Sequence, residues 1–471
     1  MSAGTDLALG ASAAVLGTWT LSWGAVATVA GLRAAVRNRN WRRTAADGSG
    51  FASVRVHLVR PCAGEDPGLA DNLRSFVDAQ RGDFRWTVSL TTGRADDPAS
   101  AVCARVAAEL REAGIEARAR PFVLPEDVVN QKVGQLHRAE RERAAQDDAP
   151  TLVVNVDSDV DLAGFDFGRF LAPLLGAATG PAGEEARGSG AATHGAVWAP
   201  PVEVCPETPA DRRSAALLSS SLHAFGLLGA LDPGSLVGKV FAVRSDALAE
   251  TGGFESYDGW LGEDMELARR LHAAGWATRC VPETASSRAR GRSRDAVVGR
   301  YARWLAVIRW QRPTLLPSYP LWFFPALVLA PAWGLLALAA WGTSASASLV
   351  AAALLGLAAT VAIRVGLAAA ARRVSRPRGA RPSWGGVAAD ALRADLTLAG
   401  AFLRCLRTDH VEWRGRRLAL TPGGRLGSVD APTGTAAGAA GVTARDVEVP
   451  LAPIGSGPAS ADRTQARSDA A

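Results

Sequence analysis

The chain has 471 residues, enough for one large folded domain together with membrane segments. Hydrophobic residues make up 48% of it and charged residues 21%, and its formal net charge is +6. Much of the basic excess lies beside apolar stretches, which favours an anionic lipid surface over nucleic acid as the partner. The five cysteines show neither a CxxC pair nor the Cys/His spacing of a zinc site, which favours a reducing cytoplasmic setting.

Residues 1–35 contain an uncharged apolar run, residues 7–32, which is longer than the ~20 residues needed to cross a bilayer. No cation precedes this run, which argues against a signal peptide, and five arginines follow it between residues 33 and 43. Because positively charged flanks stay in the cytoplasm, we expect a membrane anchor with its N-terminus outside and the remaining domain in the cytoplasm.

Residues 50–313 have the alternating strand and helix patterns of a soluble α/β domain. Apolar and polar residues alternate over residues 54–58, which predicts a strand, and residues 84–90 predict a second one. Apolar residues at helical spacing predict a helix over residues 98–113, and another helix is expected over residues 211–229.

Two carboxylates follow the most apolar of the predicted strands, in the sequence TLVVNVDSDVDL of residues 151–162. Open α/β sheets bind ligands at the carboxyl ends of their strands. Asp157 and Asp159 are therefore candidate ligands of a divalent cation, and hard oxygen ligands of this kind suit Mg²⁺ or Mn²⁺. A DxD sequence in isolation is more often a turn.

Glu263 and Asp264 open a short amphipathic helix that is expected to end at Gly275 in a left-handed cap. The positive end of the helix dipole favours ionised acids in the first turn. An anionic Asp264 could accept a proton from a hydroxyl near neutral pH. Alternatively, both acids only complement the dipole.

Arg300, Arg303 and Trp304 follow about forty residues downstream, within the sequence RYARW. Two cations and an indole on one helical turn can hold a diphosphate and stack against a sugar or a base.

Residues 314–425 begin with two apolar runs, 319–341 and 349–371, which predict a membrane hairpin returning to the cytoplasm at a group of arginines. Arg364 lies near its inner end and is expected to extend its charge toward the interface. Residues 387–407 alternate charged and apolar positions, which favours an interfacial helix, with a fourth crossing as the alternative.

Residues 426–471 are rich in Ala, Gly, Pro, Thr and Ser and are expected to be disordered.

The sequence GED followed by RxxRW resembles the signatures of membrane glycosyltransferases with the GT-A fold. The Arg-first form looks most like ceramide glucosyltransferases and bacterial hopanoid-lipid enzymes. The resemblance covers residues 53–420, including the closing sequence EWRGRRLAL, and depends on the order and spacing of several stretches. It implies a GT-A type mixed sheet flanked by helices, with transmembrane helices at both ends.

The resemblance also assigns further residues. Asp97 in DDPA would lie near the nucleotide, although Thr91, Thr92 and Gly93 stand where relatives often carry another acid. NQKV resembles the family's NPKV stretch with Gln131 in place of Pro, and Lys132 in it, one of only two lysines in the chain, favours a phosphate contact. Lys239 of GKVFAVR would lie beside the acceptor or the diphosphate, and Glu263 is assigned to the acceptor side. His194 of THGAVWAP could orient a substrate on the acceptor side, although a lone histidine is more often a hydrogen-bonded structural residue.

The resulting hypothesis is an inverting, metal-dependent transferase that moves one sugar of the glucose or N-acetylglucosamine type from a UDP-sugar to a lipid hydroxyl, on a ceramide- or hopanoid-like acceptor. In it, Asp157 and Asp159 hold Mg²⁺ or Mn²⁺ and the diphosphate, and Asp264 deprotonates the acceptor. Arg300, Arg303 and Trp304 close the donor pocket. The arginine-biased, Ala- and Gly-rich composition is typical of a GC-rich bacterial genome, so the expected location is a bacterial inner membrane, with several spans.

Two alternatives remain. A processive polysaccharide synthase of the cellulose or hyaluronan type uses QxxRW and needs more membrane helices to build a channel. A catalytically silent membrane scaffold could keep the same fold as a binding module.

Overall fold

The computed structural model describes residues 3–43, 51–64, 66–145, 151–175, 193–341, 347–375, 383–413, 416–421 and 423–428. All of them belong to one unit, Met1–Val429. The expected disordered tail lies outside the described residues, except for residues 426–428, which belong to a strand.

The domain is built on one seven-stranded sheet of order β3-β2-β1-β4-β8-β6-β9. Its first four strands in that order are parallel, β8 is antiparallel to both of its neighbours, and β6 and β9 are parallel. The predicted mixed α/β sheet is therefore confirmed. The strands are β1 (Arg55–Cys62), β2 (Arg85–Thr92), β3 (Glu116–Pro121), β4 (Leu152–Val156), β6 (His194–Trp198), β8 (Val240–Arg244) and β9 (Ala277–Cys280).

Helices cover both faces of this sheet because successive strand residues point to opposite sides. On β1, Leu58 packs into one core with α3 (Ala99–Glu112), and the next residue, Val59, packs into another with α4 (Gln131–Ala144). All five residues of β4 are buried, as the continuous apolar run predicts. The sheet therefore presents the carboxyl end of β4 at the middle of the domain.

The remaining elements surround that end. The other helices of the domain are α2 (Leu69–Arg74), α5 (Phe167–Leu175), α7 (Pro209–Ser220), α8 (Phe225–Leu231), α9 (Ser245–Glu250), α10 (Glu263–Ala273) and α11 (Arg294–Gln311). Three short 3₁₀ helices are η1 (Ser75–Asp78), η2 (Phe254–Tyr257) and η3 (Pro313–Leu315). Two small sheets have the orders β5-β10-β7 and β11-β12-β13. Their strands are β5 (Val160–Asp161), β7 (Pro201–Val204), β10 (Ala285–Arg288), β11 (His410–Trp413), β12 (Arg416–Thr421) and β13 (Arg425–Ser428).

The helix expected over residues 211–229 is instead two helices, α7 and α8, with a break at residues 221–224. Near the break, Ser220 and Ser221 donate their hydroxyls to the carbonyls of Ala216 and Leu217. Such bonds from serine side chains to the preceding turn compete with regular helix geometry. The break contains His223, which lines the cavity described in the next section.

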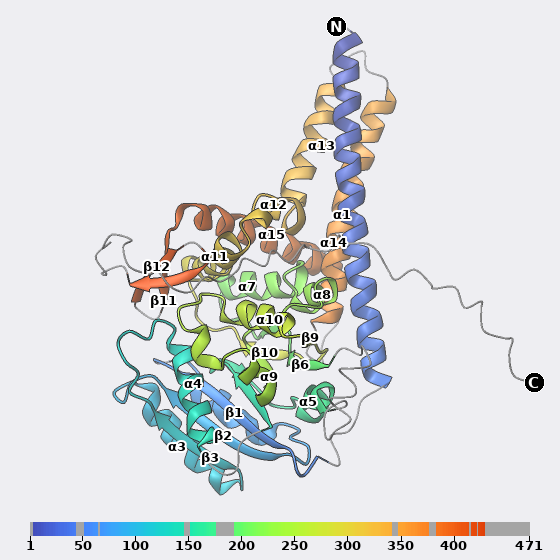
Figure 1. Ribbon diagram of the computed structural model, residues 1–471. Coiled ribbons are helices and arrows are strands. Elements are labelled where there is room, and N and C mark those ends of the chain that lie inside the picture. The colour runs from blue at the N-terminus through green and yellow to red at the C-terminus, as the bar shows by residue number, and fades with distance from the viewer. Residues whose placement is uncertain are drawn as a thin grey trace, which may run out of the picture. The chain divides into compact units, whose positions relative to one another are not determined.

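Three long apolar helices lie side by side: α1 (Ala3–Arg43), α13 (Ala326–Trp341) and α14 (Ala347–Val374) (Figure 1). By length and composition, three helical stretches of the described chain could cross a membrane: Gly4–Trp41, Pro209–Leu231 and Ala347–Val374, the second of them 72% buried. Buried residues of α1 between Trp23 and Ala34 share one apolar core with residues 222–227 and with α13 and α14.

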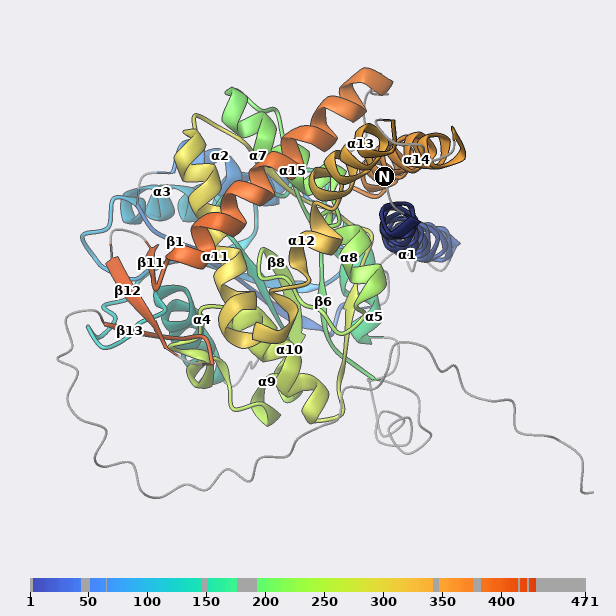
Figure 2. The same cartoon turned by 90° about the horizontal axis from the view of Figure 1, so that it is seen from above.

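The short helix α12 (Tyr319–Phe323) precedes α13, and α15 (Trp384–Arg407) follows α14. Seen from above, α15 runs over α7 and beside α11 (Figure 2). It leaves several large apolar residues at least 43% exposed: Trp384, Leu392, Leu396, Leu403 and Leu406. A helix with one face on the protein and an exposed apolar face is suited to an interfacial position.

Arg364 does not extend toward the interface as expected. It is 5% exposed and forms a two-pronged ion pair with Asp395 of α15, at 2.8 to 3.0 Å. Its guanidinium also donates to the carbonyls of Ser220 and Ala391. The partner in α15 satisfies the buried charge, so the side chain needs no contact with water.

Candidate active site

The turn after β4 carries Asp157 and Asp159 and is held by a buried arginine of the neighbouring strand. Arg60 is fully buried in β1 and donates to the carbonyls of Asp157 at 3.0 Å and Val160 at 2.6 Å. A third bond, to the carbonyl of Asn72, is 2.6 Å long. The arginine thus fixes the backbone of the DxD turn.

Six charged residues converge around this turn, and we call them the carboxylate–lysine cluster: Lys132, Asp157, Asp159, Lys239, Glu263 and Asp264. The ammonium of Lys132 lies 2.9 Å from Asp157 and 3.3 Å from Glu263. Lys239 pairs with Asp159. Both lysines of the chain therefore neutralise the DxD carboxylates.

Opposite charges in this cluster favour the ionised forms of both Asp159 and Lys132. Its enclosed position opposes ionisation of Asp159, but Lys239 and Arg300 lower its pKa to about 2. Burial opposes the charge on Lys132 as well, but Asp157 and Glu263 raise its pKa above the usual value. These groups therefore stay charged at neutral pH.

Asp264, in the first turn of α10, is held by two backbone amides. Its Oδ2 accepts from Gly238 N at 2.7 Å and its Oδ1 from Met265 N at 2.8 Å. Burial and the adjacent Glu263 raise its pKa to about 7, against the opposing effect of Lys132. The pKa of this carboxylate therefore lies above its ordinary value despite its place in the first turn of α10, in the range where a general base is effective.

Gly238 connects the parts of the cluster. Its N–H binds Asp264, and its carbonyl accepts from Lys132 at 2.9 Å and from Asn155 at 2.8 Å. A side chain at this position would begin 3.1 Å from Asp264 Oδ2 and 3.3 Å from Lys132 Nζ. The glycine allows this close approach.

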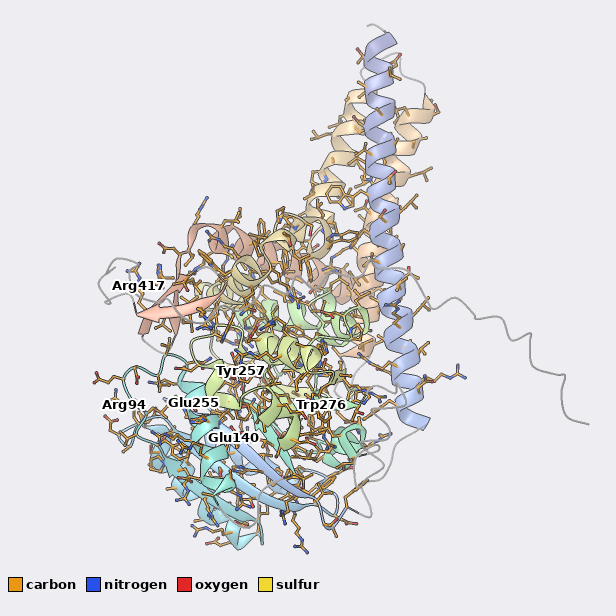
Figure 3. The ribbon with its side chains drawn as sticks, viewed as in Figure 1. Arg94, Glu140, Glu255, Tyr257, Trp276 and Arg417 are labelled. Atoms are coloured by element: carbon orange, nitrogen blue, oxygen red, sulfur yellow. The ribbon has the colours of Figure 1, made fainter. Side chains whose placement is uncertain are left out.

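The start of α10 is fixed from both sides. A Cβ on Gly262 would lie 2.5 Å from Val307 of α11, so the glycine of GED lets the two helices meet. Before it, two contacts hold η2 in place. Glu140 accepts from Phe254 N at 3.2 Å, and the ring centre of Tyr257 lies 4.8 Å from the guanidinium of Arg270. Glu140 and Tyr257 are labelled in Figure 3. The predicted cap is confirmed, since Gly275 follows α10 with a φ of 85°.

The sheet β11-β12-β13, which includes part of EWRGRRLAL, closes over this segment. Leu261 N donates to Gly424 O at 3.2 Å, and Leu426 N donates to Gly259 O at 2.7 Å. The last resembling stretch therefore supports the segment that leads into GED.

Helix α11 places Arg300, Arg303 and Trp304 beside the cluster. Arg300 pairs with Glu203 of β7, a buried carboxylate that also binds Arg292 at 2.7 Å. The guanidinium of Arg300 lies 5.2 Å from the centre of the Trp304 ring. Glu203 thus fixes the position of the first arginine of RxxRW.

A cavity of about 800 Å³ contains these residues and continues along α11 toward α12. There it is lined by residues that we call the aromatic cluster: His223, Phe225, Tyr319, Trp322 and Phe323. Trp304 links the two parts, since its ring lies 5.5 Å from that of Phe225. One cavity therefore joins a charged site to an aromatic site near the apolar helices.

Two predicted residues lie outside the lining of this cavity. Asp97 Oδ1 accepts from Gly64 N at 2.8 Å and from Ala99 N at 2.9 Å, so it ties the loop after β1 to α3. His194 begins β6, whereas the other end of that strand, Trp198, pairs in register with Phe241 near Lys239. Asp97 can act on the site through that loop, and His194 is separated from it by the length of a strand.

The expected cation must fit the donors that are present. Within the described ranges, no group of three or more His, Cys, Asp or Glu side chains converges as a metal site. Asp159 Oδ1 is nevertheless a buried carboxylate oxygen without a hydrogen-bond partner there. Two carboxylates can hold Mg²⁺ or Mn²⁺ when diphosphate oxygens and water supply the other ligands. The donors therefore fit, provided that the cation displaces the lysines.

Sequence reasoning missed several residues of the site. Arg60 interrupts an apolar strand and His223 interrupts an apolar helix pattern, and either interruption could have marked them. Asp66, which lines the cavity and accepts from Ser158 Oγ at 3.3 Å, stands in a loop without a distinctive pattern. Glu203 gave no local signal, because its partners lie about ninety residues away.

Comparisons with known proteins place the chain among sugar transferases. Residues 54–306 match the family model described as glycosyltransferase like family 2, and residues 214–426 match that of glycosyl transferase family 21. No curated protein matches the chain significantly.

Several solved structures resemble it at low identity. The mannosyltransferase PcManGT of Pyrobaculum calidifontis, in complex with GDP-Man and Mn²⁺, is 18% identical over 83% of this chain and 99% of its own, with a TM-score of 0.42. A fragment of TarS from S. aureus in complex with UDP-GlcNAc is 8% identical over 79% and 98%, with a TM-score of 0.33. A mycobacterial protein is 19% identical over 55% and 74%, with a TM-score of 0.31.

Proposed function

The chain belongs to the glycosyltransferase like family 2, whose model covers more than half of it, and we propose that it transfers one sugar from a UDP-sugar to the hydroxyl of a membrane lipid. The observation that carries this proposal is the single cavity that joins the carboxylate–lysine cluster to the aromatic cluster beside the apolar helices.

The carboxylate–lysine cluster suits a nucleotide diphosphate. Mg²⁺ or Mn²⁺ bound by Asp157 and Asp159 would neutralise charge on the diphosphate. Lys132 and Lys239, displaced from those carboxylates, would then be available to the phosphate oxygens, as compact cations usually are at phosphate sites. Arg300, held by Glu203, and Arg303 would steady the leaving diphosphate, and Trp304 would stack against the donor.

Asp264 would act as the general base. In this step the acceptor oxygen bonds to the anomeric carbon, the bond from that carbon to the diphosphate breaks, and the hydroxyl proton passes to the carboxylate. A single base opposite the leaving group gives inversion, because the reaction needs no second, nucleophilic carboxylate.

A lipid acceptor is supported by the aromatic cluster, which offers apolar surface rather than charge. Its neighbours α12 and α13 lead directly into the group of long apolar helices (Figure 1). The arginine-rich end of α1 packs on the same domain, with Arg37 donating to Gly226 O at 2.8 Å. By the positive-inside rule, this supports a catalytic domain in the cytoplasm, at a bacterial inner membrane.

The proposed donors are UDP-sugars of the glucose or N-acetylglucosamine type, and the proposed acceptors are ceramide- or hopanoid-like lipids. To test this, the full-length protein in lipid nanodiscs is incubated with labelled nucleotide sugars and each lipid class, and the product is extracted and analysed. A single-sugar glycolipid of inverted configuration is expected. Products of increasing length would instead indicate a polysaccharide synthase, and nucleotide binding without any turnover would indicate a scaffold.

A further inference from the structure

A second, smaller cavity lies on the outer surface of the helix group, between α1 and α12. It has a volume of about 480 Å³ and is lined by Ala14, Val15, Thr18, Trp19, Ser22, Leu321 and Trp322. We call it the α1–α12 groove. Apart from two hydroxyl residues, its α1 side is apolar, and it lies within the apolar run that the sequence assigns to the bilayer.

Trp322 lines both this groove and the catalytic cavity. One indole of the aromatic cluster therefore belongs to the lining of both cavities. Beside it, Trp19 donates to Leu321 O at 3.2 Å, so α1 is fastened to α12 at the bottom of the groove. In the same part of α1, Trp333 of α13 donates to Thr20 at 3.1 Å.

The depth of the groove also fits a lipid chain. The groove residues of α1 lie between residues 14 and 22, in the middle of the apolar run of residues 7–32, and precede the arginines that begin at Arg33. In a bilayer spanned by these helices, this is the depth of hydrocarbon chains.

We propose that the hydrocarbon chain of the acceptor lipid lies in the α1–α12 groove and enters the catalytic cavity past Trp322. The inference rests on the proposed function for the nature of the acceptor. It commits to a lipid chain because the groove shares Trp322 with the cavity that contains Asp264 and has no charged residue in its lining. A soluble acceptor would need neither feature.

The test uses two tryptophan variants one helical turn apart. Thr18 lines the groove, so Thr18→Trp fills it, whereas Leu21 is 74% exposed and absent from its lining, so Leu21→Trp adds the same side chain elsewhere. The full-length protein in nanodiscs is photolabelled with octadecanol carrying a mid-chain diazirine, and the labelled peptides are quantified. Glycolipid formation and nucleotide binding are measured on the same samples.

Labelling of the peptide containing Leu321 and Trp322 should fall roughly tenfold in Thr18→Trp, as expected when about two methylene groups lose their burial, and stay unchanged in Leu21→Trp. Glycolipid formation should fall in parallel, with unchanged nucleotide binding. Equal labelling in both variants would refute binding of the lipid chain in the α1–α12 groove, whether or not glycolipid is made. If Thr18→Trp lowers the labelling but no glycolipid is formed by the unmodified protein, lipid binding in the groove is supported and the proposed function is refuted.

Discussion

The two parts of the catalytic cavity are built on opposite principles. In the carboxylate–lysine cluster, each charged group forms an ion pair or accepts a hydrogen bond from a backbone amide, as Asp264 does from Gly238. In the aromatic cluster, ring contacts dominate, such as His223 beside Phe323 at 4.7 Å and Tyr319 stacked on Phe323 at 4.2 Å. The charges of the first part suit a diphosphate with its divalent cation. The rings of the second part suit a ligand with few polar groups.

This difference implies that the two parts can be damaged separately. Changes in the charged part should affect chemistry or donor binding, whereas changes near the membrane should affect the acceptor or stability only. The following predictions test that separation, in order of decreasing effect on turnover.

The largest effect is expected from Asp264→Asn, which keeps the shape of the side chain but cannot accept a proton. General-base catalysis typically contributes about 10²–10⁴-fold, so single-turnover transfer should fall by that factor while nucleotide binding changes little. If Asp264 only complemented the dipole of α10, the change would instead cost about 0.3–1 kcal/mol of stability and leave turnover intact. Thermal unfolding of the same preparation distinguishes the two results.

Removal of the divalent cation should come next. Chelation should abolish transfer, and added Mg²⁺ or Mn²⁺ should restore it. Asp159→Asn should lower turnover at fixed donor by roughly 10²-fold, the usual cost of losing one electrostatic stabiliser. Asp96→Asn is the matched control, because that carboxylate is exposed and pairs with Arg94, which is also exposed. Undiminished transfer in excess chelator would refute the metal assignment.

A smaller, graded effect is expected from pH. Burial and Glu263 raise the pKa of Asp264 to about 7, and only the ionised form accepts a proton. At saturating donor, turnover should therefore fall about tenfold for each pH unit below about 7 and level off above it. Lys132 lowers this pKa, so Lys132→Met should move the midpoint of the profile upward. A profile that is flat between pH 5 and 8 would mean that Asp264 is not the base.

The smallest effect on turnover is expected from Asp395→Asn, although it also breaks a buried ion pair. Arg364 and Asp395 lie outside the cavity lining, so turnover per folded molecule should stay close to normal. Stability should fall by about 3–5 kcal/mol, because the variant leaves an uncompensated buried arginine. Differential scanning fluorimetry in detergent measures the loss. A catalytic defect in the folded fraction would show that the charged site and the membrane helices are coupled.

The turn of residues 221–224 shows why the aromatic cluster was harder to foresee than the charged one. An apolar helix pattern runs through it, and only serine side chains that bond back to carbonyls mark the break. His223 reaches the cavity because of that break and hydrogen-bonds Tyr319, almost a hundred residues away. Local patterns cannot express a contact of that sequence separation.

The sequence by itself determined the alternating strands and helices, the position of the DxD carboxylates after a buried strand and the long apolar helices, because periodicity and strand-end chemistry are local properties. The mixed order of the sheet was implied by the resemblance to GT-A glycosyltransferases. The sequence also indicated that GED and RxxRW belong together, but not which contacts they make. Only the tertiary structure decided that Lys132 and Lys239 pair with the DxD acids, that Glu203 holds Arg300, and that burial moves the pKa of Asp264 to about 7. These properties depend on the distance between charges and on their removal from water, and both arise when distant segments pack together.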